Sequence, residues 1–361
     1  MFEERRSKLV QALRSKHLDA AVLVPGAGMY YFTGLKLNHS ERLTFAIITK
    51  KGELVLVFPQ VEYDKAESIA EAKKFFYTDE QGPNEVLKKA SAVIQMEKIG
   101  IEYEHMNVKE LKALESLNTE ATIDISIIVN NFKNCKDSKE VENMKKAVQI
   151  VENSLDATLP YIKEGVQELE IAAHLEYEMR KRGSEGTPFG TTVASGYRGA
   201  LPHGRASNKQ INNGELVVID FGAIFNGYVA DITRTVAVGE ISNELKEIYQ
   251  VVKAAQQKSV EIIKPGITAH EVDEAARAII RDHGYGDYFT HRTGHGLGLN
   301  AHEEPYIMQN NEAVLQPGMA FTVEPGIYLP DKGGVRIEDD LIVTEDGCLN
   351  LMSYTKNLIT L

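Results

Sequence analysis

Two aspartates flank a predicted β-hairpin turn and could hold a metal ion together. The turn is Asn226-Gly227, a pair typical of two-residue hairpin loops, because both positions take positive φ. With that turn, Asp220 lies opposite Thr233, and side chains alternate between the two faces of each strand. Asp220, Asp231 and Thr233 therefore project from one face, where the two carboxylates are diagonal neighbours within reach of a shared metal. The alternative for this pair is a solvated edge of the sheet.

Three of the ten histidines in the chain lie close together in the sequence. The segment THRTGHGLGLNAH contains His291, His295 and His302. Glycines between them allow the backbone to pack closely around whatever the imidazoles hold. A single histidine is usually a core or surface residue, whereas three among glycines indicate a binding site.

Two further carboxylates follow in apolar segments that predict strands. Glu324 ends the apolar part of FTVEP, and Glu338 lies within VRIEDDL. In the second segment a period of two places Arg336, Glu338 and Asp340 on one face. Taken alone, Glu338 and Arg336 could form a simple ion pair.

Together these segments supply four carboxylates and one imidazole: Asp220, Asp231, His295, Glu324 and Glu338. Oxygen-rich sites with one nitrogen ligand suit divalent Mn, Co, Zn or Fe rather than a thiolate-bound structural zinc. Two divalent ions would balance the four negative charges, so the set predicts two metal ions, with manganese as the first candidate. Water activated between the ions would be the nucleophile, because a metal lowers the pKa of its water toward ~7.

The surrounding segments predict an α+β protein. Strands that pair by hairpins among helices favour an antiparallel sheet in the second part of the chain. Before it, short apolar runs alternate with helical patterns and indicate a separate α/β unit. The polar segment NNFKNCKD predicts a domain boundary near residues 130–137. The expected strands are 20–25, 44–49, 53–58, 216–222, 228–238, 320–328 and 335–343, and the expected helices are 3–16, 61–73, 84–92, 107–117, 138–159, 168–182, 242–263 and 268–283.

Composition argues against several other classes of function. The formal net charge is -12, so the surface should repel nucleic acid and anionic lipid. The chain has no apolar stretch near the ~20 residues that cross a bilayer, and MFEERRSKLV lacks the apolar segment of a secretory signal. Cys135 and Cys348 lie far apart and form no CxxC pair, as is typical of reduced thiols. We expect a cytoplasmic protein without nucleic-acid or membrane partners.

The sequence resembles the creatinase/methionine-aminopeptidase-like metallopeptidases, and among them the proline-specific branch of Xaa-Pro dipeptidases (prolidases) and aminopeptidases P. The matching stretches are ASGYRGALPHG, VVIDFGAIFNGYVADITRT, HRTGHGLGLNAHEEP, GMAFTVEPGIYL and VRIEDDLIVT. The family's ligand order Asp, Asp, His, Glu, Glu is present in full. The resemblance is strong over residues 130–361 and looser over residues 1–125.

The resemblance implies a role for each metal ligand. Asp220 would bind one ion, and His295 and Glu324 would bind the other. Asp231 and Glu338 would bridge both ions. Glu324 would also relay a proton during attack on the substrate.

The resemblance also implies residues that contact the substrate or support the ligands. His203 would lie near the substrate carbonyl, and His302 would steady the tetrahedral intermediate. His291 would lie near the proline end of the substrate. Arg336 would support Glu338 and the acid cluster. Thr233 would contact one of the metal ligands, because it projects from the same strand face as Asp220 and Asp231. Tyr328 is a candidate pocket wall, with a plain strand aromatic as the alternative.

The implied architecture is a pita-bread metallopeptidase domain over residues 131–361, preceded by a smaller α/β creatinase-like N-terminal domain over residues 1–130. The implied assembly is a homodimer. The implied reaction is hydrolysis of the peptide bond before proline in Xaa-Pro dipeptides or short Xaa-Pro peptides. A prolyl bond lacks an N–H, so a pocket that accepts the ring can exclude other residues sterically.

Other members of the same group are alternatives. A methionine aminopeptidase usually lacks the preceding domain, a creatinase lacks the full acidic set, and an inactive pita-bread binding module would have lost ligands. An Xaa-Pro aminopeptidase acting on longer peptides stays open. Some dipeptide-restricted relatives place an acid and a histidine from an N-terminal loop near the site. The loop LKLNHSER has Asn38 and His39 instead, which leaves strict dipeptide preference undecided.

Overall fold

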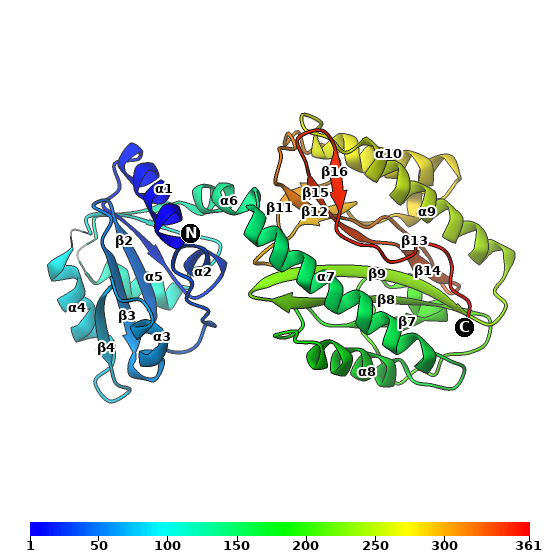
Figure 1. Cartoon of the computed structure of the whole chain (residues 1–361), viewed down its shortest axis with the longest axis horizontal. Coiled ribbons are helices and arrows are strands. Elements are labelled where there is room, and N and C mark those ends of the chain that lie inside the picture. Colours follow the sequence, from blue (N-terminus) through cyan, green and yellow to red (C-terminus); the bar gives the residue numbers. More distant parts are fainter. Residues whose placement is uncertain (95, 118) are drawn as a thin grey trace. The chain divides into compact units, whose positions relative to one another are not determined.

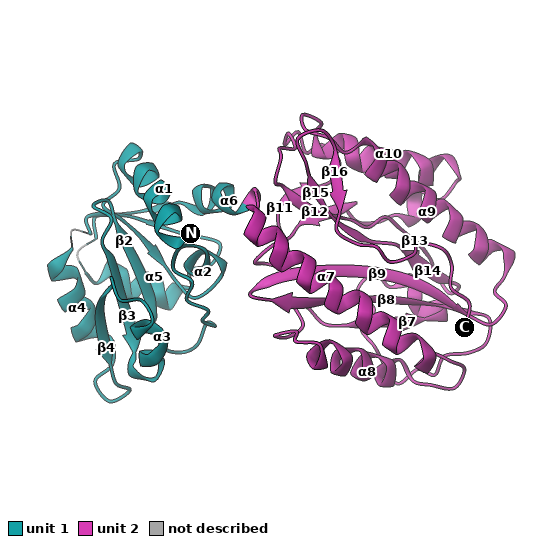
Figure 2. Ribbon diagram, in the orientation of Figure 1, with its two compact units in different colours: residues 1–133 teal, residues 134–361 magenta. Residues whose placement is uncertain are grey.

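The structure is a computed structural model (Figure 1), and it describes residues 1–94, 96–117 and 119–361. It divides into two compact units, Met1–Lys133 and Asn134–Leu361, which Figure 2 shows in separate colours. Helix α6 (Ser126–Asn134) occupies most of the segment that looked weakly patterned in the sequence. Its buried residues Val129 and Lys133 are one helical turn apart, a spacing that the polar composition had obscured. Within the described ranges, no helix combines the length and the apolar character that crossing a bilayer requires.

The first unit is built on a six-stranded sheet of order β4-β3-β2-β1-β5-β6. The central strand β2 is antiparallel to both β1 and β3, and the outer strands join in parallel. The strands are β1 Ala20–Leu23, β2 Phe45–Thr49, β3 Leu54–Pro59, β4 Lys73–Tyr77, β5 Lys98–Ile101 and β6 Ala121–Asp124. The helices before α6 are α1 Phe2–Ser15, α2 Ala27–Thr33, α3 Tyr63–Glu67, α4 Asn84–Val93 and α5 Val108–Glu115, and a 3-10 turn, η1, spans Gln60–Glu62.

The three strands expected in this unit are present, and three further strands were missed. β4, β5 and β6 are only four or five residues long, and exposed or charged residues interrupt their apolar pattern. The helix expected over 61–73 is wrong in length, because α3 ends at Glu67 and β4 begins at Lys73. β4 pairs in parallel with β3, the preceding strand, so its residues are extended by sheet pairing although their sequence pattern favoured a helix.

The second unit places strands between two pairs of helices (Figure 1). Helices α7 and α8 pack on the sheet β7-β8-β9, while α9 and α10 pack together and contact β11, β12, β13 and β14. Asp137 caps α7 and accepts hydrogen bonds from the backbone of Lys139 and Glu140. The helices are α7 Ser138–Thr158, α8 Glu168–Lys181, α9 Asn243–Ile262 and α10 Ala269–Asp282, with 3-10 turns η2 Leu159–Tyr161, η3 Gly196–Ala200 and η4 Gly286–Tyr288. The strands are β7 Thr192–Ser195, β8 Glu215–Phe225, β9 Tyr228–Val238, β10 Gly294–Gly296, β11 Glu303–Ile307, β12 Ala320–Val323, β13 Gly326–Leu329, β14 Gly333–Arg336, β15 Asp339–Val343 and β16 Cys348–Asn350.

The hairpin of β8 and β9 has the register that the sequence predicted. Asp220 pairs with Thr233, and Asp231 pairs with Gly222. The turn residues Asn226 and Gly227 have φ of 48° and 81°, as a two-residue turn of this kind requires. Both aspartates therefore leave the hairpin on the same face.

The two later segments that looked like single strands are each divided in two. β12 ends before Glu324 and Pro325, and β13 follows; β14 ends at Arg336, and β15 begins after Glu338. The expectation that Glu338 lies inside a strand is therefore wrong. β12 pairs with β15 in a five-stranded sheet, whereas β13 pairs with β14 in a separate two-stranded sheet. Both breaks fall where the chain passes from one sheet to the other, and each carries a glutamate.

Candidate metal centre

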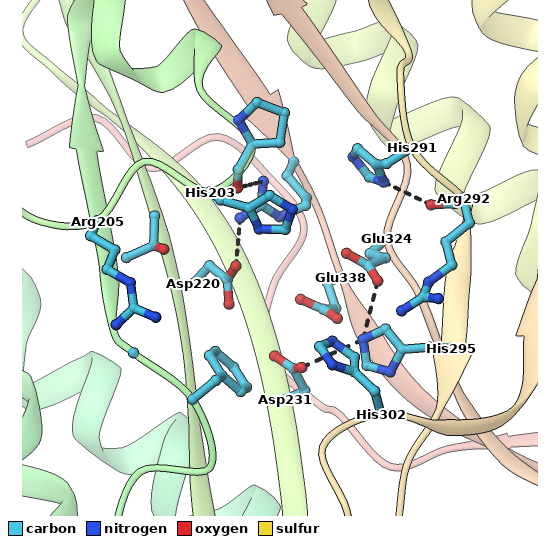
Figure 3. A pocket seen from close by; sticks show the side chains of 15 residues that line it. His203, Arg205, Asp220, Asp231, His291, Arg292, His295, His302, Glu324 and Glu338 are labelled. Carbon is cyan, nitrogen blue, oxygen red and sulfur yellow. Dashed lines mark hydrogen bonds and ion pairs between the residues drawn. The ribbon is translucent and has the colours of Figure 1, made fainter. Parts of the chain in front are cut away.

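A cavity of about 520 Å³ in the second unit collects the side chains that the sequence had singled out (Figure 3). The residues that line it come from the loops after α8 and η3, from β7, from the β8–β9 hairpin, from the segment 291–302 that contains β10, from β14 and from the two strand breaks. Thr233 and Tyr328 lie behind this wall. The lining residues predicted from sequence are His203, Asp220, Asp231, His291, His295, His302, Glu324, Arg336 and Glu338.

Three of the predicted ligands form a tight group at the floor of this cavity. One ligand atom each from Asp231, His295 and Glu338 lies within 4.8 Å of the other two, and all three residues are buried. The Nε2 atom of His295 is also 3.3 Å from Oε1 of Glu324 and 3.8 Å from Oδ2 of Asp231. These atoms are therefore arranged around a common point, as ligands of one metal centre would be.

Asp220 lines the same cavity but is held by an arginine. Nη2 of Arg336 lies 2.5 Å from Oδ2 of Asp220. Nε of the same guanidinium donates to the Thr233 hydroxyl at 3.1 Å, and that hydroxyl donates to Oε2 of Glu338 at 2.6 Å. Arg336 and Thr233 thus connect the ligand on β8 with the ligand at the second strand break.

The buried carboxylates of the cavity lack enough partners within the protein. Oδ1 of Asp231 and Oε1 of Glu338 have no hydrogen-bond partner among the described residues. Burial and repulsion by neighbouring acids raise the pKa of Asp231 and of Glu338 well above their usual ranges. Burial likewise raises the pKa of Glu324 to about 7. Uncompensated buried charge is costly, and a divalent cation among these oxygens would remove that cost.

His295 has the chemical form that a metal ligand needs. Burial and the neighbouring His302 lower the pKa of His295 to about 3, so the imidazole is neutral. Its Nδ1 atom lies 3.0 Å from the carbonyl oxygen of Gly296, which places the proton on Nδ1. The lone pair of Nε2 therefore faces the carboxylates of Asp231 and Glu324. This donor set fits divalent metal ions.

A hydrogen-bonded row supports His291 on one side of the cavity. Nη1 of Arg336 donates to the Tyr328 hydroxyl at 2.9 Å, and that hydroxyl lies 2.7 Å from Nε2 of His291. Nδ1 of His291 lies 2.7 Å from the carbonyl oxygen of Arg292 and donates to it. Tyr328 is buried behind these residues, so the structure gives it a supporting position rather than a place on the cavity wall.

The other two predicted histidines approach the centre from separate loops. The His302 ring meets the His295 ring edge to face, with centroids 4.2 Å apart, and burial lowers the pKa of His302. His203 is exposed on the cavity wall, in the loop that follows η3. Arg336 also fixes that loop, because its Nη1 atom donates to the carbonyl oxygen of Pro202 at 3.3 Å.

Two arginines of the cavity wall were missed in the sequence. Arg205 lies two residues after His203, and Arg292 directly follows His291. Both are loop residues, so strand or helix periodicity gives no indication of where they point. Their closeness in sequence to predicted site histidines was the available signal.

Comparisons with known proteins agree with this geometry. The chain matches Metallopeptidase family M24 over residues 142–345 and the Creatinase/Prolidase N-terminal domain over residues 5–133. It is 41% identical to the Xaa-Pro dipeptidase of Pyrococcus furiosus, in an alignment that covers 99% of this chain and 100% of that protein.

Solved structures give the same result. The prolidase of Pyrococcus horikoshii OT3 superposes with a TM-score of 0.92 at 38% identity, covering 99% of this chain and 100% of the other. The X-Pro aminopeptidase of Thermotoga maritima superposes with a TM-score of 0.89 at 36% identity, covering 99% of each chain. The Pyrococcus relatives are named as an Xaa-Pro dipeptidase and a prolidase, whereas the Thermotoga maritima relative is named as an X-Pro aminopeptidase.

Proposed function

This chain belongs to Metallopeptidase family M24, and we propose that it hydrolyses the peptide bond before proline in Xaa-Pro dipeptides. Its fold is the pita-bread domain of that family, preceded by a Creatinase/Prolidase N-terminal domain. One observation carries the proposal. Asp231, His295 and Glu338 converge within 4.8 Å, and two of their buried carboxylate oxygens lack any partner in the described part of the chain.

The cavity would hold two divalent metal ions. We assign Asp220 to one ion, His295 and Glu324 to the other, and Asp231 and Glu338 to both. Manganese is our first candidate, because four carboxylates and one imidazole form an oxygen-rich set. When bound, the ions would polarise the scissile carbonyl and lower the pKa of a water molecule.

Glu324 is suited to moving a proton during the reaction. Its carboxyl group lines the cavity, with Oε1 3.3 Å from Nε2 of His295, so it is placed beside the reacting groups where it could take up and release a proton. In this proposal its Oε atoms accept a proton as the carbonyl is attacked. The same group then helps to protonate the departing proline nitrogen.

His203 and His302 would stabilise the charge that develops on the carbonyl oxygen. Both line the cavity beside the ligand group, and each ring can donate an N–H hydrogen bond. Arg336 contributes by position, since it holds Asp220 and the carbonyl of Pro202 at once. Its contact with Tyr328 orients His291 toward the cavity.

Hydrolysis of Ala-Pro by metal-loaded protein tests the proposal. Release of free proline that stops on chelation and returns with Mn²⁺ is the expected result. Failure to cleave Ala-Pro or any Ala-Pro-Xaa peptide with any of Mn²⁺, Co²⁺, Zn²⁺ or Fe²⁺ would contradict it. A second candidate function is that of an Xaa-Pro aminopeptidase, which the likeness to the Thermotoga maritima enzyme favours. The same substrates distinguish this function from that of a dipeptidase. A dipeptidase cleaves Ala-Pro faster than the longer peptide, and an aminopeptidase shows the reverse.

We also propose a cytoplasmic homodimer. The two cysteines are free, which fits a reducing compartment, and the homodimer rests on the family resemblance. Light scattering of the protein as it elutes from a size-exclusion column would measure the mass of the assembly, for comparison with the 40.1 kDa of one chain. A mass of one chain across the working concentration range would contradict the dimer.

A further inference from the structure

Besides Arg336, which pairs with Asp220, the cavity has two further guanidinium groups, and they lie on opposite sides of the ligand cluster. Figure 3 shows Arg205 on one side and Arg292 on the other, with Asp220 and Glu338 between them. The guanidinium of Arg292 lies over the ring of Tyr306, 4.3 Å from its centroid. For Arg205, the part of the chain that the structure describes offers the guanidinium no carboxylate and no hydrogen-bond acceptor.

The backbone of Arg205 is fixed by a buried carboxylate. Its carbonyl oxygen accepts a hydrogen bond of 2.6 Å from Nη2 of Arg198, whose Nε atom donates to Glu168 at 3.0 Å. Glu168 is fully buried and also accepts from the backbone and hydroxyl of both Ser195 and Ser207. The loop between those two serines is therefore held at both ends. Arg205 is thus presented from an anchored backbone, although its side chain is exposed.

Space for the guanidinium is made by a glycine. A methyl group placed on Gly190 would overlap Nη1 of Arg205, so the side chain of Arg205 lies directly against that residue. The backbone of Gly190 is not in the left-handed region, so its conformation alone does not require glycine. The contact shows where the guanidinium lies, and it offers a way to displace the group without removing its charge.

The charge balance of the cavity favours an anionic substrate. In the proposed function, two divalent ions would balance the four carboxylates. The arginines of the wall would then leave the cavity positive, and among them Arg205 has no partner in the described ranges of the chain. A guanidinium matches the two oxygens of a carboxylate in a planar, bidentate arrangement.

We propose that Arg205 is a subsite for a carboxylate of the peptide substrate, which deepens the proposed function and rests on it. A peptide can offer that group from an acidic side chain before proline or from its C-terminus. Because Arg205 and Arg292 face each other across the ligand cluster, a peptide with both groups would meet a cation at each end. Glu-Pro and Asp-Pro are dipeptides of this kind.

Four substrates separate the two sources of the carboxylate. Glu-Pro against Gln-Pro reports on a side-chain carboxylate, and Ala-Pro against Ala-prolinamide reports on the C-terminal one. We expect Arg205→Gln to reduce one of these two preferences in kcat/KM by roughly 10- to 100-fold, the range for losing a hydrogen bond between charged groups. Arg205→Lys should restore part of it, because the charge returns without the planar fork.

Two further variants show whether the effect belongs to the guanidinium. Gly190→Ala keeps the charge but displaces the group, so it should reduce the same preference in the same direction. Arg281→Gln is the matched control, since Arg281 is exposed on α10 and pairs with Glu274 away from the cavity. Melting temperatures of all variants would show that each is folded.

The proposal is overturned if Arg205→Gln changes neither preference more than Arg281→Gln does. If the unaltered protein hydrolyses none of the four substrates, that result would instead reject the proposed function. In that case, thermal stabilisation of the protein by Glu-Pro compared with Gln-Pro tests Arg205 separately. Equal stabilisation of the unaltered protein and of Arg205→Gln would then reject the subsite.

Discussion

Glu338 and Asp339 are adjacent in the chain and both are buried, yet their carboxylates have opposite surroundings. Asp339 lies 2.7 Å from Nη2 of Arg234 and 2.6 Å from Nζ of Lys356. Glu338 accepts a hydrogen bond from the Thr233 hydroxyl, and its other oxygen has no partner among the described residues. The fold thus provides two cations for one carboxylate and none in direct contact with its neighbour.

The pKa values follow this difference. Burial raises the pKa of Asp339, but Arg234 and Lys356 more than offset that effect and hold it below the usual value. The pKa of Glu338 is raised well above its usual range by burial, and Glu324 adds to the rise. The comparison indicates that the protein balances a structural carboxylate with its own side chains. Where it leaves carboxylates unbalanced, the proposed divalent ions would supply the missing charge.

The largest expected effect is on activity when Asp231, a proposed bridging ligand, is neutralised. Asp231→Asn keeps the shape of the side chain but removes its charge, so it should lower kcat for Ala-Pro by more than ~100-fold, since changes in outer partners of a metal site already cost about 10–100-fold. The folded state should persist, because the replaced carboxylate is unfavourable without metal. Turnover assays with circular dichroism would measure both properties, and turnover like that of the unaltered protein would contradict the bridging role.

Neutralising the balanced carboxylate should instead affect folding. Asp339→Asn leaves Arg234 buried without its carboxylate, and we expect a loss of about 3 kcal/mol in the free energy of unfolding, at the lower end of the range for breaking a buried pair. Glu244→Gln is the matched control, because its pair with Lys332 is largely exposed and should contribute under about 1 kcal/mol. Urea unfolding would measure both values. Equal destabilisation by the two substitutions would undermine the comparison.

The unbalanced cavity should also make the metal-free protein sensitive to pH. The pKa of Glu324 is about 7 when folded and 4.5 by reference, so its stabilising contribution is present below pH 4.5 and is lost as the pH rises through about 7. That interval corresponds to about 3 kcal/mol. Asp231 and Glu338 act in the same direction.

Unfolding of chelated protein at acidic and at mildly basic pH would measure this dependence. The control variant is Glu324→Gln, which cannot titrate at this position and should lose stability less steeply as the pH rises. An identical pH dependence in the two proteins would show that Glu324 is already compensated.

The smallest of these effects concerns the hydroxyl between Arg336 and Glu338. Thr233→Val has nearly the same shape but removes both hydrogen bonds, and it should weaken metal affinity by roughly 10-fold. Thr235→Val is the control, because that hydroxyl bonds to the backbone of Arg336 instead. Metal titrations would compare the two variants. Equal metal affinities in Thr233→Val and Thr235→Val would show that the Thr233 hydroxyl does not support the site.

Much of the site could be predicted because its signals are local. The Asn226-Gly227 turn and the two-residue period of strands determine the face on which Asp220 and Asp231 lie, and the structure has that register. Histidines among glycines and glutamates in apolar segments were visible in the same way. Their convergence in one cavity was implied by charge balance and by the family pattern.

Other features depend on contacts between distant segments and could not be predicted. The breaks at Glu324 and Glu338 arise because each half of the segment pairs in a different sheet. The position of Tyr328 behind His291 follows from the same change of sheet. The position of Arg205 in the cavity depends on an anchored loop and on the space beside Gly190, neither of which leaves a periodic pattern.

Metal content tests the central claim most directly. Chelated protein would be loaded with Mn²⁺, freed of excess ion, and analysed by mass spectrometry for metal bound per chain, with Asp231→Asn beside it. We predict two ions per chain in the unaltered protein and fewer in the variant. A chain that stays folded and binds no divalent ion would contradict the conclusion that the buried acids of this cavity are balanced by metal.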